Sequence, residues 1–230
     1  VLLAALGEMR PELAQKTRHF FFFLFRLPDG KMSSRTGKIL TGEWLLDEAK
    51  QRVLVILAQS KQAGKLTLSE PEIEQVAEQI GQAAIKFALL STRLGKDIAF
   101  DFDTSLSFSG FSGPYLQYTA TRCKSVLAKA EAEGETPSES LQAVLTADER
   151  LLVQELSRSM EVRERTTNEL APHVLAEYLF KVAQAFNSFY TNQPILHSPQ
   201  SAFRLWLCER VLHELTTGLG LLGIQVPKQM

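Results

Sequence analysis

Cysteine and histidine are scarce in this chain of 230 residues, and their spacing argues against a metal site of the common kinds. The two cysteines, Cys123 and Cys208, each fall at an apolar position of a helical pattern. Such positions are typical of small, reduced core residues rather than of disulfides. None of the four histidines stands at metal-ligand spacing from a cysteine or from another histidine. We therefore expect no metal site.

The chain also lacks a long apolar run and an excess of charge. The longest apolar run near its start, Phe20 to Phe25, is too short to cross a bilayer, and no signal-peptide pattern is present. A formal net charge of −1 argues against sequence-blind binding of DNA or long RNA, which needs a broad basic surface. A small RNA site with a local group of cations is compatible with this net charge. The first residue is Val1, in a helix-like pattern, which suggests a piece of a longer chain.

Apolar residues recur at helical spacing through most of the chain, and 45% of all residues are hydrophobic, enough for a substantial core. Two capping boxes are expected, one with Ser69 and Glu72 and one with Thr146 and Glu149. The first opens a helix through Phe87, and the second opens a helix whose apolar face includes Met160. Further helices are expected near 45–60, from Pro114, from Pro172, and from Pro199 to a stop at Gly218 and Gly220.

Two segments depart from this helical pattern. His19 to Leu27 is an apolar, aromatic-rich run closed by Pro28-Asp29-Gly30, which predicts a buried strand. The helical period is also lost between residues 96 and 113. The expected fold is therefore mainly α, a helical bundle preceded by a short strand and loop, with a division near residue 95.

The segment from Gly30 to Lys38 is polar and basic, which predicts a surface loop. It holds three cations, Lys31, Arg35 and Lys38, and the hydroxyl pair Ser33 and Ser34. Such a loop can close over phosphates, because cations offset their charge while hydroxyl and backbone N–H groups donate hydrogen bonds. On composition alone, a solvated charged turn is the favoured interpretation of this segment.

Lys31-Met32-Ser33-Ser34-Arg35 resembles the second signature of class I aminoacyl-tRNA synthetases, usually written KMSK followed by serine. In that family the loop follows the nucleotide-binding sheet and closes over ATP. A mobile cationic loop that reaches the phosphates only when closed stabilises the charge on departing pyrophosphate selectively. The resemblance makes Lys31, Met32, Ser33 and Ser34 ATP-binding candidates, with Lys31, Ser33, Ser34, Arg35 and Lys38 as the catalytic set.

Two longer segments resemble arginyl-tRNA synthetases in particular. Residues 96–103, with their Phe-Asp-Phe-Asp run, precede Gly-Pro-Tyr-Leu-Gln-Tyr at 113–118 and then Arg122. The end of the chain is similar too, with Ala-Phe-Asn-Ser-Phe-Tyr at 185–190, Gly-Leu-Leu-Gly-Ile at 220–224 and a terminal Met230. Four separated segments match in the order in which the family has them, and together the resemblance covers nearly the whole chain from about residue 20. Arg35, at or beside the position of the second signature lysine, also favours this branch.

The resemblance implies the carboxy-terminal part of an arginine–tRNA ligase, which joins arginine to its tRNA with ATP and Mg²⁺. Residues 1–95 would end a Rossmann-like catalytic domain, and residues 96–230 would form a helical anticodon-binding domain. The implied partner is an arginine-accepting tRNA, in a cytoplasmic, monomeric enzyme without a membrane or DNA role. The implied RNA contacts are Tyr115, Thr119, Arg122, Tyr190 and Met230.

Other polar residues keep two interpretations open. Lys124, Arg163, Arg165 and Arg204, like Arg122, are either phosphate contacts or solvated helix faces. Gln117 and Asn187 either bridge the bundle or contact RNA, and each tyrosine is either an RNA contact or a core ring. Phe186 and Phe189 are assigned to the core.

Two other functions are open at this stage. Asp101 and Asp103 have the spacing of an aspartyl-phosphate motif, but no α/β alternation surrounds them. A helical interaction domain without RNA binding would leave the loop at Lys31 without a role. Clustering of Tyr115, Tyr190 and Met230 on one face would favour RNA binding. The His-Ile-Gly-His signature of the family is absent from the chain, so we expect these residues alone not to charge tRNA.

Overall fold

A computed structural model describes residues 1–19, 25–27, 41–64, 66–140 and 144–230. In chain order its elements are α1 (Leu2–Met9), α2 (Pro11–Lys16), β1 (Phe25–Arg26), α3 (Gly42–Gln62), α4 (Glu70–Leu90), β2 (Ile98–Ala99), α5 (Phe102–Ser105), α6 (Gly113–Ala132), α7 (Ala147–Ser157), α8 (Ser159–Glu169), α9 (Pro172–Asn192) and α10 (Ser201–Leu221). The fold is mainly α, as predicted. No helix in the described ranges has both the length and the apolar character that a membrane span requires.

Local capping signals set the starts of two helices, and both capping boxes are confirmed. The Ser69 backbone N–H donates to Glu72 at 2.9 Å, at the start of α4. The Thr146 N–H donates to Glu149 at 2.7 Å, and its hydroxyl accepts from the Glu149 N–H at 3.3 Å. Each box satisfies backbone donors that have no partner within the first turn.

The predicted helix that carries Met160 is wrong in one respect. The helical run is interrupted at Arg158, where α7 ends and α8 begins, and the Met160 side chain is 81% exposed. Met160 therefore does not belong to the apolar face of α7, on which Leu152 is fully buried. Val162 of α8 is buried instead.

The end of α10 also differs from the prediction. The helix runs through Gly218 and Gly220 to Leu221, and the chain leaves it at Gly223, whose φ is 68°. A Cβ on Gly218 would lie 2.5 Å from Cδ2 of Leu179, so this glycine lets α9 and α10 approach closely. Gly218 is a packing residue and not a helix stop.

The two short strands pair in parallel, with Phe25 opposite Ile98 and Arg26 opposite Ala99. The Phe100 N–H extends this pairing by donating to the Arg26 carbonyl at 2.8 Å. The rings of Phe25 and Phe100 stack with their centroids 5.5 Å apart. Of the strand predicted from His19 to Leu27, residues 20–24 lie outside the described part of the chain.

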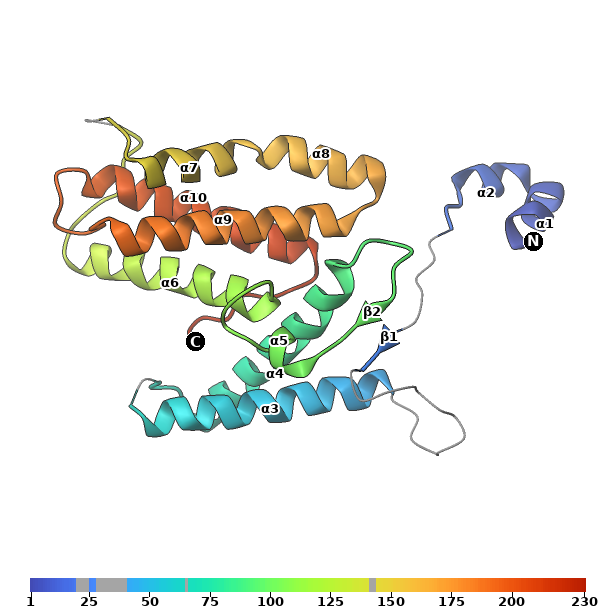
Figure 1. The fold of residues 1–230 in the computed structure, drawn as a ribbon, viewed down its shortest axis with the longest axis horizontal. Coiled ribbons are helices and arrows are strands. Elements are labelled where there is room, and N and C mark those ends of the chain that lie inside the picture. Colours follow the sequence, from blue (N-terminus) through green and yellow to red (C-terminus); the bar gives the residue numbers. More distant parts are fainter. Residues whose placement is uncertain (20–24, 28–40, 65, 141–143) are drawn as a thin grey trace.

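Two hydrophobic clusters make up the core. We call them upper and lower because α6 to α10 lie above α3 and α4 in Figure 1. The upper cluster joins α6 to α10, with Phe186 and Phe189 fully buried in it, as predicted. The lower cluster joins α3, α4 and residues 98–106. Helix α4 contributes to both, because Phe87 faces the upper cluster and Ile80 the lower one. In Figure 1, α1 and α2 lie to one side of both layers.

The carboxy-terminal tail links the two clusters. The buried Gln117 amide donates to the Gln225 carbonyl at 2.6 Å, and the Lys124 ammonium donates to the Pro227 carbonyl at 3.0 Å. Met230 then packs against the lower cluster. Gln117 thus bridges the bundle, which is one of its two predicted roles.

Candidate nucleic-acid interface

A polar network on α6 and α9 centres on Asn187. Its Nδ2 donates to the Tyr115 hydroxyl at 2.9 Å and to the Thr119 hydroxyl at 3.0 Å, and its Oδ1 accepts from Arg122. These bonds fix the orientation of the amide from both of its ends. We call the following residues the α6–α9 cluster: Tyr115, Tyr118, Arg122, Asn187 and Tyr190.

Two aromatic rings hold the Arg122 guanidinium. Its central carbon lies 4.6 Å from the ring centroid of Tyr118 and 4.8 Å from that of Tyr190. The same guanidinium donates to the Tyr118 hydroxyl at 2.7 Å. Rings and cation attract each other through the ring quadrupole, so this arginine is held in place before any ligand arrives.

The cluster is open to solvent on one side. Tyr190 is 39% exposed, and Tyr115, Tyr118, Arg122 and Asn187 are half-buried. A surface of partly exposed rings around a fixed guanidinium offers stacking faces, ring edges and hydrogen-bond donors together. These are the groups by which proteins bind unpaired RNA bases.

Of the two other predicted RNA contacts, Thr119 does not lie on this open surface, and Met230 is half-buried against another part of the core. The Thr119 side chain is fully buried and donates to the Tyr115 carbonyl at 2.9 Å, so it supports Asn187 instead of reaching a base. Met230 packs against the lower cluster. Gln117 and Lys124, which hold the tail, lie about 160° around α6 from Tyr115 and Arg122 at about 100° per residue. Tyr115 and Tyr190 are linked through Asn187 and Arg122, so the predicted clustering holds for these two tyrosines.

Two phenylalanines that the sequence did not single out extend the aromatic surface. Phe111 is 45% exposed, and its ring lies edge-on to Phe180 with centroids 5.0 Å apart. Phe180 in turn lies 5.6 Å from Tyr115. The available signal was Phe111 itself, a large apolar residue in a Ser-Gly-Phe-Ser-Gly run where a loop would normally be polar.

Both interpretations of Arg204, a phosphate contact and a solvated helix face, are wrong. Arg204 is only 6% exposed, and its Nε lies 2.8 Å from the fully buried Glu149 carboxylate. Its Nη1 donates to the Pro194 carbonyl at 2.7 Å. A buried carboxylate needs such a partner, so this arginine is a structural group of the bundle.

The other candidate cations also have partners within the chain. Arg163 pairs with Glu214 at 2.9 Å, and Arg165 pairs with Glu169 at 2.9 Å on the exposed surface of α8. Burial lowers the pKa of Lys124, whose ammonium is bound to the tail. Among the predicted cations on described residues, Arg122 is the one that belongs to the α6–α9 cluster.

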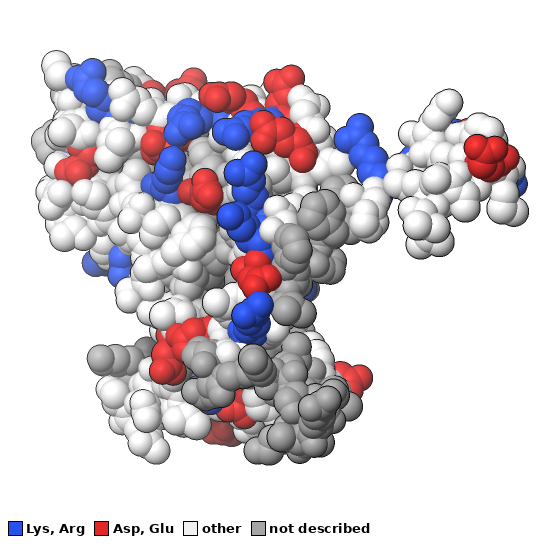
Figure 2. All heavy atoms as spheres, turned by 45° about the vertical axis from the view of Figure 1, so that its right-hand side comes forward, with Lys and Arg blue, Asp and Glu red and all other residues white. Residues whose placement is uncertain are grey.

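The charged surface is mixed, in keeping with the net charge of −1. On the face shown in Figure 2, Lys and Arg side chains form a broken vertical file interrupted by Asp and Glu. No continuous basic surface covers the described residues on that face. Local groups such as those of the α6–α9 cluster can supply specific contacts without such a surface.

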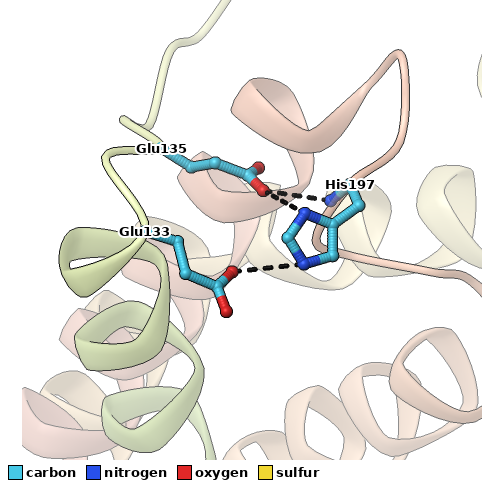
Figure 3. Close-up of side chains that lie close together, drawn as sticks. All are labelled: Glu133, Glu135 and His197. Carbon is cyan, nitrogen blue, oxygen red and sulfur yellow. Dashed lines mark hydrogen bonds and ion pairs between the residues drawn. The ribbon is translucent and has the colours of Figure 1, made fainter.

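A histidine between two glutamates is the one group of metal-ligand type found among the described residues (Figure 3). His197 Nε2 lies 3.2 Å from Glu133, and Nδ1 lies 3.1 Å from Glu135. The two ring nitrogens thus face different carboxylates, which suits a bridging imidazole better than a shared ion. The His197 imidazole joins the end of α6 to the segment between α9 and α10.

The loop candidates Lys31, Met32, Ser33, Ser34, Arg35 and Lys38 lie outside the described residues. Asp101 of the aspartyl-phosphate alternative is the N-cap of α5, and its carboxylate accepts from the Thr104 N–H at 2.8 Å. Hydrogen bonds from the Thr104 backbone and hydroxyl lower the pKa of Asp101. This is the ordinary role of an aspartate at a helix start.

Two family models match the chain. Residues 2–102 match "tRNA synthetases class I (R), catalytic domain", and residues 116–230 match "DALR anticodon binding domain". The second match contains most of α6 and all of α7 to α10, and therefore the whole described α6–α9 cluster except Tyr115.

Similar proteins agree with these matches. The chain is 36% identical over 216 residues to an arginine–tRNA ligase of Halobacterium salinarum, covering 94% of this chain and 33% of that protein. It is 31% identical over 235 residues to one of Porphyromonas gingivalis, covering 100% and 39%. The solved arginyl-tRNA synthetase of Thermus thermophilus has a TM-score of 0.84 at 32% identity, with 100% and 38% covered. The chain thus spans about two fifths or less of the length of these relatives.

Proposed function

This chain belongs to the class I arginyl-tRNA synthetases, and we propose that it is the carboxy-terminal part of an arginine–tRNA ligase that binds the anticodon of an arginine-accepting tRNA. In this proposal the α6–α9 cluster is the anticodon-binding surface. The observation that carries it is the Arg122 guanidinium, fixed by Asn187 and by the rings of Tyr118 and Tyr190.

The physical chemistry of an anticodon supports this assignment. Anticodon bases are unpaired, so their flat faces and polar edges are accessible to a protein. Stacking on one aromatic side chain contributes about 1–3 kcal/mol per base. The exposed part of Tyr190 and the half-buried ring of Tyr115 can supply that contact, and Arg122 can attract the backbone phosphates.

The proposal divides the chain by role. Residues 1–95 would complete the catalytic domain, and residues 96–230 would hold the anticodon. In the whole enzyme, Lys31, Ser33, Ser34, Arg35 and Lys38 would close over ATP with its Mg²⁺ while arginine is activated. Met32 would belong to the same ATP loop. A cytoplasmic, monomeric enzyme stays a prediction.

Binding to a tRNA transcript tests the anticodon proposal. We would compare an arginine-accepting tRNA with a variant changed at the central anticodon cytosine, at two salt concentrations. Specific binding predicts weaker binding to the changed tRNA at both salts. Equal binding to the two tRNAs, with a steep dependence on salt, would reduce the interaction to non-specific charge and refute the proposal.

Point variants locate the surface. Tyr190→Ala is expected to weaken binding to the unchanged tRNA roughly 5- to 150-fold, the equivalent of about 1–3 kcal/mol. Trp206→Ala is the matched control, because Trp206 on α10 also lies beside an arginine, Arg210, at 6.0 Å. Trp206→Ala should bind as the unmutated chain does. Equal losses in both variants would place the RNA elsewhere.

A further inference from the structure

A pocket of about 470 Å³ continues the α6–α9 cluster toward the carboxy-terminal end of α6. It shares Arg122 and Tyr190 with the cluster, and it adds Ser125 and Lys129 of α6 and Gln193 after α9. We call it the Lys129 pocket. Its size is within the range of pockets that hold small organic groups, about 300–1,000 Å³.

The lining of the Lys129 pocket suits a nucleotide. Its inner wall is apolar, with Val126, Ile195 and Leu196, and the Tyr190 ring stands at one side. Lys129, 63% exposed in its side chain, stands at the rim. Flat apolar walls beside an aromatic ring favour a base, and a cation at the rim favours its phosphate.

The charge around the pocket fits the same ligand. None of the residues that line it, all within the described chain, is acidic. Within the described part of the chain, Lys129 pairs with the Glu133 carboxylate at 3.9 Å, which is a weak pair on an exposed surface. A second hollow near the same end of α6, of about 450 Å³, is lined by three carboxylates, those of Glu131, Glu135 and Glu209, and by one cation, Lys124, whose ammonium donates to the Pro227 carbonyl. That hollow would repel RNA, and the Lys129 pocket would not.

The outer wall of the pocket is held in position without a ligand. Arg204 donates to the Pro194 carbonyl at 2.7 Å and to the Gln193 side chain at 3.3 Å, and its own position is fixed by Glu149. Farther along the same segment, the His197 N–H donates to Glu135 at 3.1 Å, and the His197 ring lies between that carboxylate and Glu133 (Figure 3). A wall fixed at two points loses little conformational entropy when a ligand binds.

From these contacts we propose that the Lys129 pocket takes one unpaired nucleotide of the bound RNA loop. Its base lies against the apolar wall beside Tyr190, and its phosphate lies at Lys129. The inference rests on the proposed anticodon binding and adds a separate subsite to it. Arg204 is a positioning residue of this subsite, since it touches the wall and not the RNA.

Hairpin RNAs with the sequence of the anticodon arm test the subsite. One loop nucleotide at a time is replaced by an abasic one, and the affinity of the 230-residue chain for each hairpin is measured. The unmutated chain should lose affinity for several of these hairpins. The loss at each position defines a profile in which every occupied subsite is visible.

Two variants then act on the pocket alone. Ser125→Leu places a larger side chain at the pocket wall, and Lys129→Gln removes the cation; both positions are exposed on α6, so the fold is expected to persist. Each should weaken binding of the complete hairpin roughly 5- to 150-fold. In Ser125→Leu, the abasic penalty should vanish at a single loop position. Arg158→Gln, which removes a cation from an i,i+3 pair with Glu155, should change neither quantity.

The outcomes separate the two proposals. If the unmutated chain binds no hairpin, or shows no abasic penalty, the anticodon proposal fails and the pocket proposal fails with it. If the unmutated chain shows a position-dependent profile and Ser125→Leu and Lys129→Gln leave affinity and profile unchanged, the pocket proposal alone is refuted. Circular dichroism melting of each variant shows that the fold is kept.

Discussion

Replacement of Arg204 by methionine is the substitution whose effect the structure predicts most strongly. The residue is 6% exposed, and its partner Glu149 is fully buried. Their charged groups lie 2.8 Å apart, and Arg204 also donates to the Pro194 carbonyl at 2.7 Å. Methionine has a similar length but no charge or donor, so Arg204→Met leaves the carboxylate buried without its ion-pair partner.

The expected cost follows from that lost partner. Removing one member of a buried ion pair typically lowers the free energy of unfolding by about 3–5 kcal/mol, because the other charge stays desolvated. Loss of the bond to Pro194, about 1 kcal/mol, is included in that range. The measurement is urea unfolding followed by circular dichroism at pH 7, compared with the unmutated chain at an unchanged slope m.

A second arginine provides the control. Arg165 forms its pair with Glu169 four residues along an exposed helix face, where such a pair contributes about 0.3–0.5 kcal/mol. Arg165→Met should therefore change the unfolding free energy by less than 1 kcal/mol. If Arg204→Met costs no more than Arg165→Met, the Glu149 carboxylate must be reached by water or another donor, and the reasoning from burial is refuted.

The same pair predicts a dependence on pH. The net pKa of Glu149 is lowered from 4.5. Burial acts to raise this pKa, but hydrogen bonds from the Thr146 backbone, Arg204 and the Thr146 hydroxyl together lower it by more. A lowered pKa contributes stability that is present above pH 4.5 and is lost as pH falls through the folded-state pKa. The gap in unfolding free energy between the unmutated chain and Arg204→Met should therefore narrow from pH 7 to pH 3.5. A difference in unfolding free energy that stays constant between pH 7 and pH 3.5 would contradict the prediction that the Glu149–Arg204 pair stabilises the fold through the Glu149 charge.

Two more predictions concern packing. A Cβ on Gly113 would lie 2.4 Å from the carbonyl oxygen of Ala83, so Gly113→Ala should lower the unfolding free energy by about 1–3 kcal/mol. Gly42→Ala is the control and should not lower it, because a Cβ on Gly42 would have no atom within 4 Å. Equal melting temperatures for the two variants would contradict this prediction. Burial raises the pKa of Cys208 to about 12 and that of Cys123 well above its usual value, so neither thiol should react with a disulfide reagent at pH 8 until the chain unfolds, and fast native labelling would disprove it.

The helix starts and the family could be predicted from the sequence because their causes are local. A capping box involves residues three positions apart, so Ser69 with Glu72 and Thr146 with Glu149 show the same bonds in the sequence pattern and in the fold. Helical periodicity likewise placed Phe186 in the core. The motifs from 96 to 122 and from 185 to 230 predicted the family, and the matching family models confirm it.

The roles of individual polar residues were decided by packing between distant segments. The sequence contains Arg122 and Arg204 as equivalent cations, but α9 brings Asn187 to one, 65 positions away, and α7 brings Glu149 to the other, 55 positions away. No rule of neighbouring residues distinguishes them. The sequence likewise predicts Gly218 to be a helix stop, whereas the structure shows that its missing Cβ makes room for the Leu179 side chain.

The sequence by itself therefore determined most of the helical segments, where several of them begin, and to which family the chain belongs. The tertiary structure decided which residues form the candidate RNA surface, which cations are internal, and where the Lys129 pocket lies. The physical reason is the range of the interactions. Caps and periodicity act within about one helical turn, whereas burial and hydrogen bonding depend on which helices pack together.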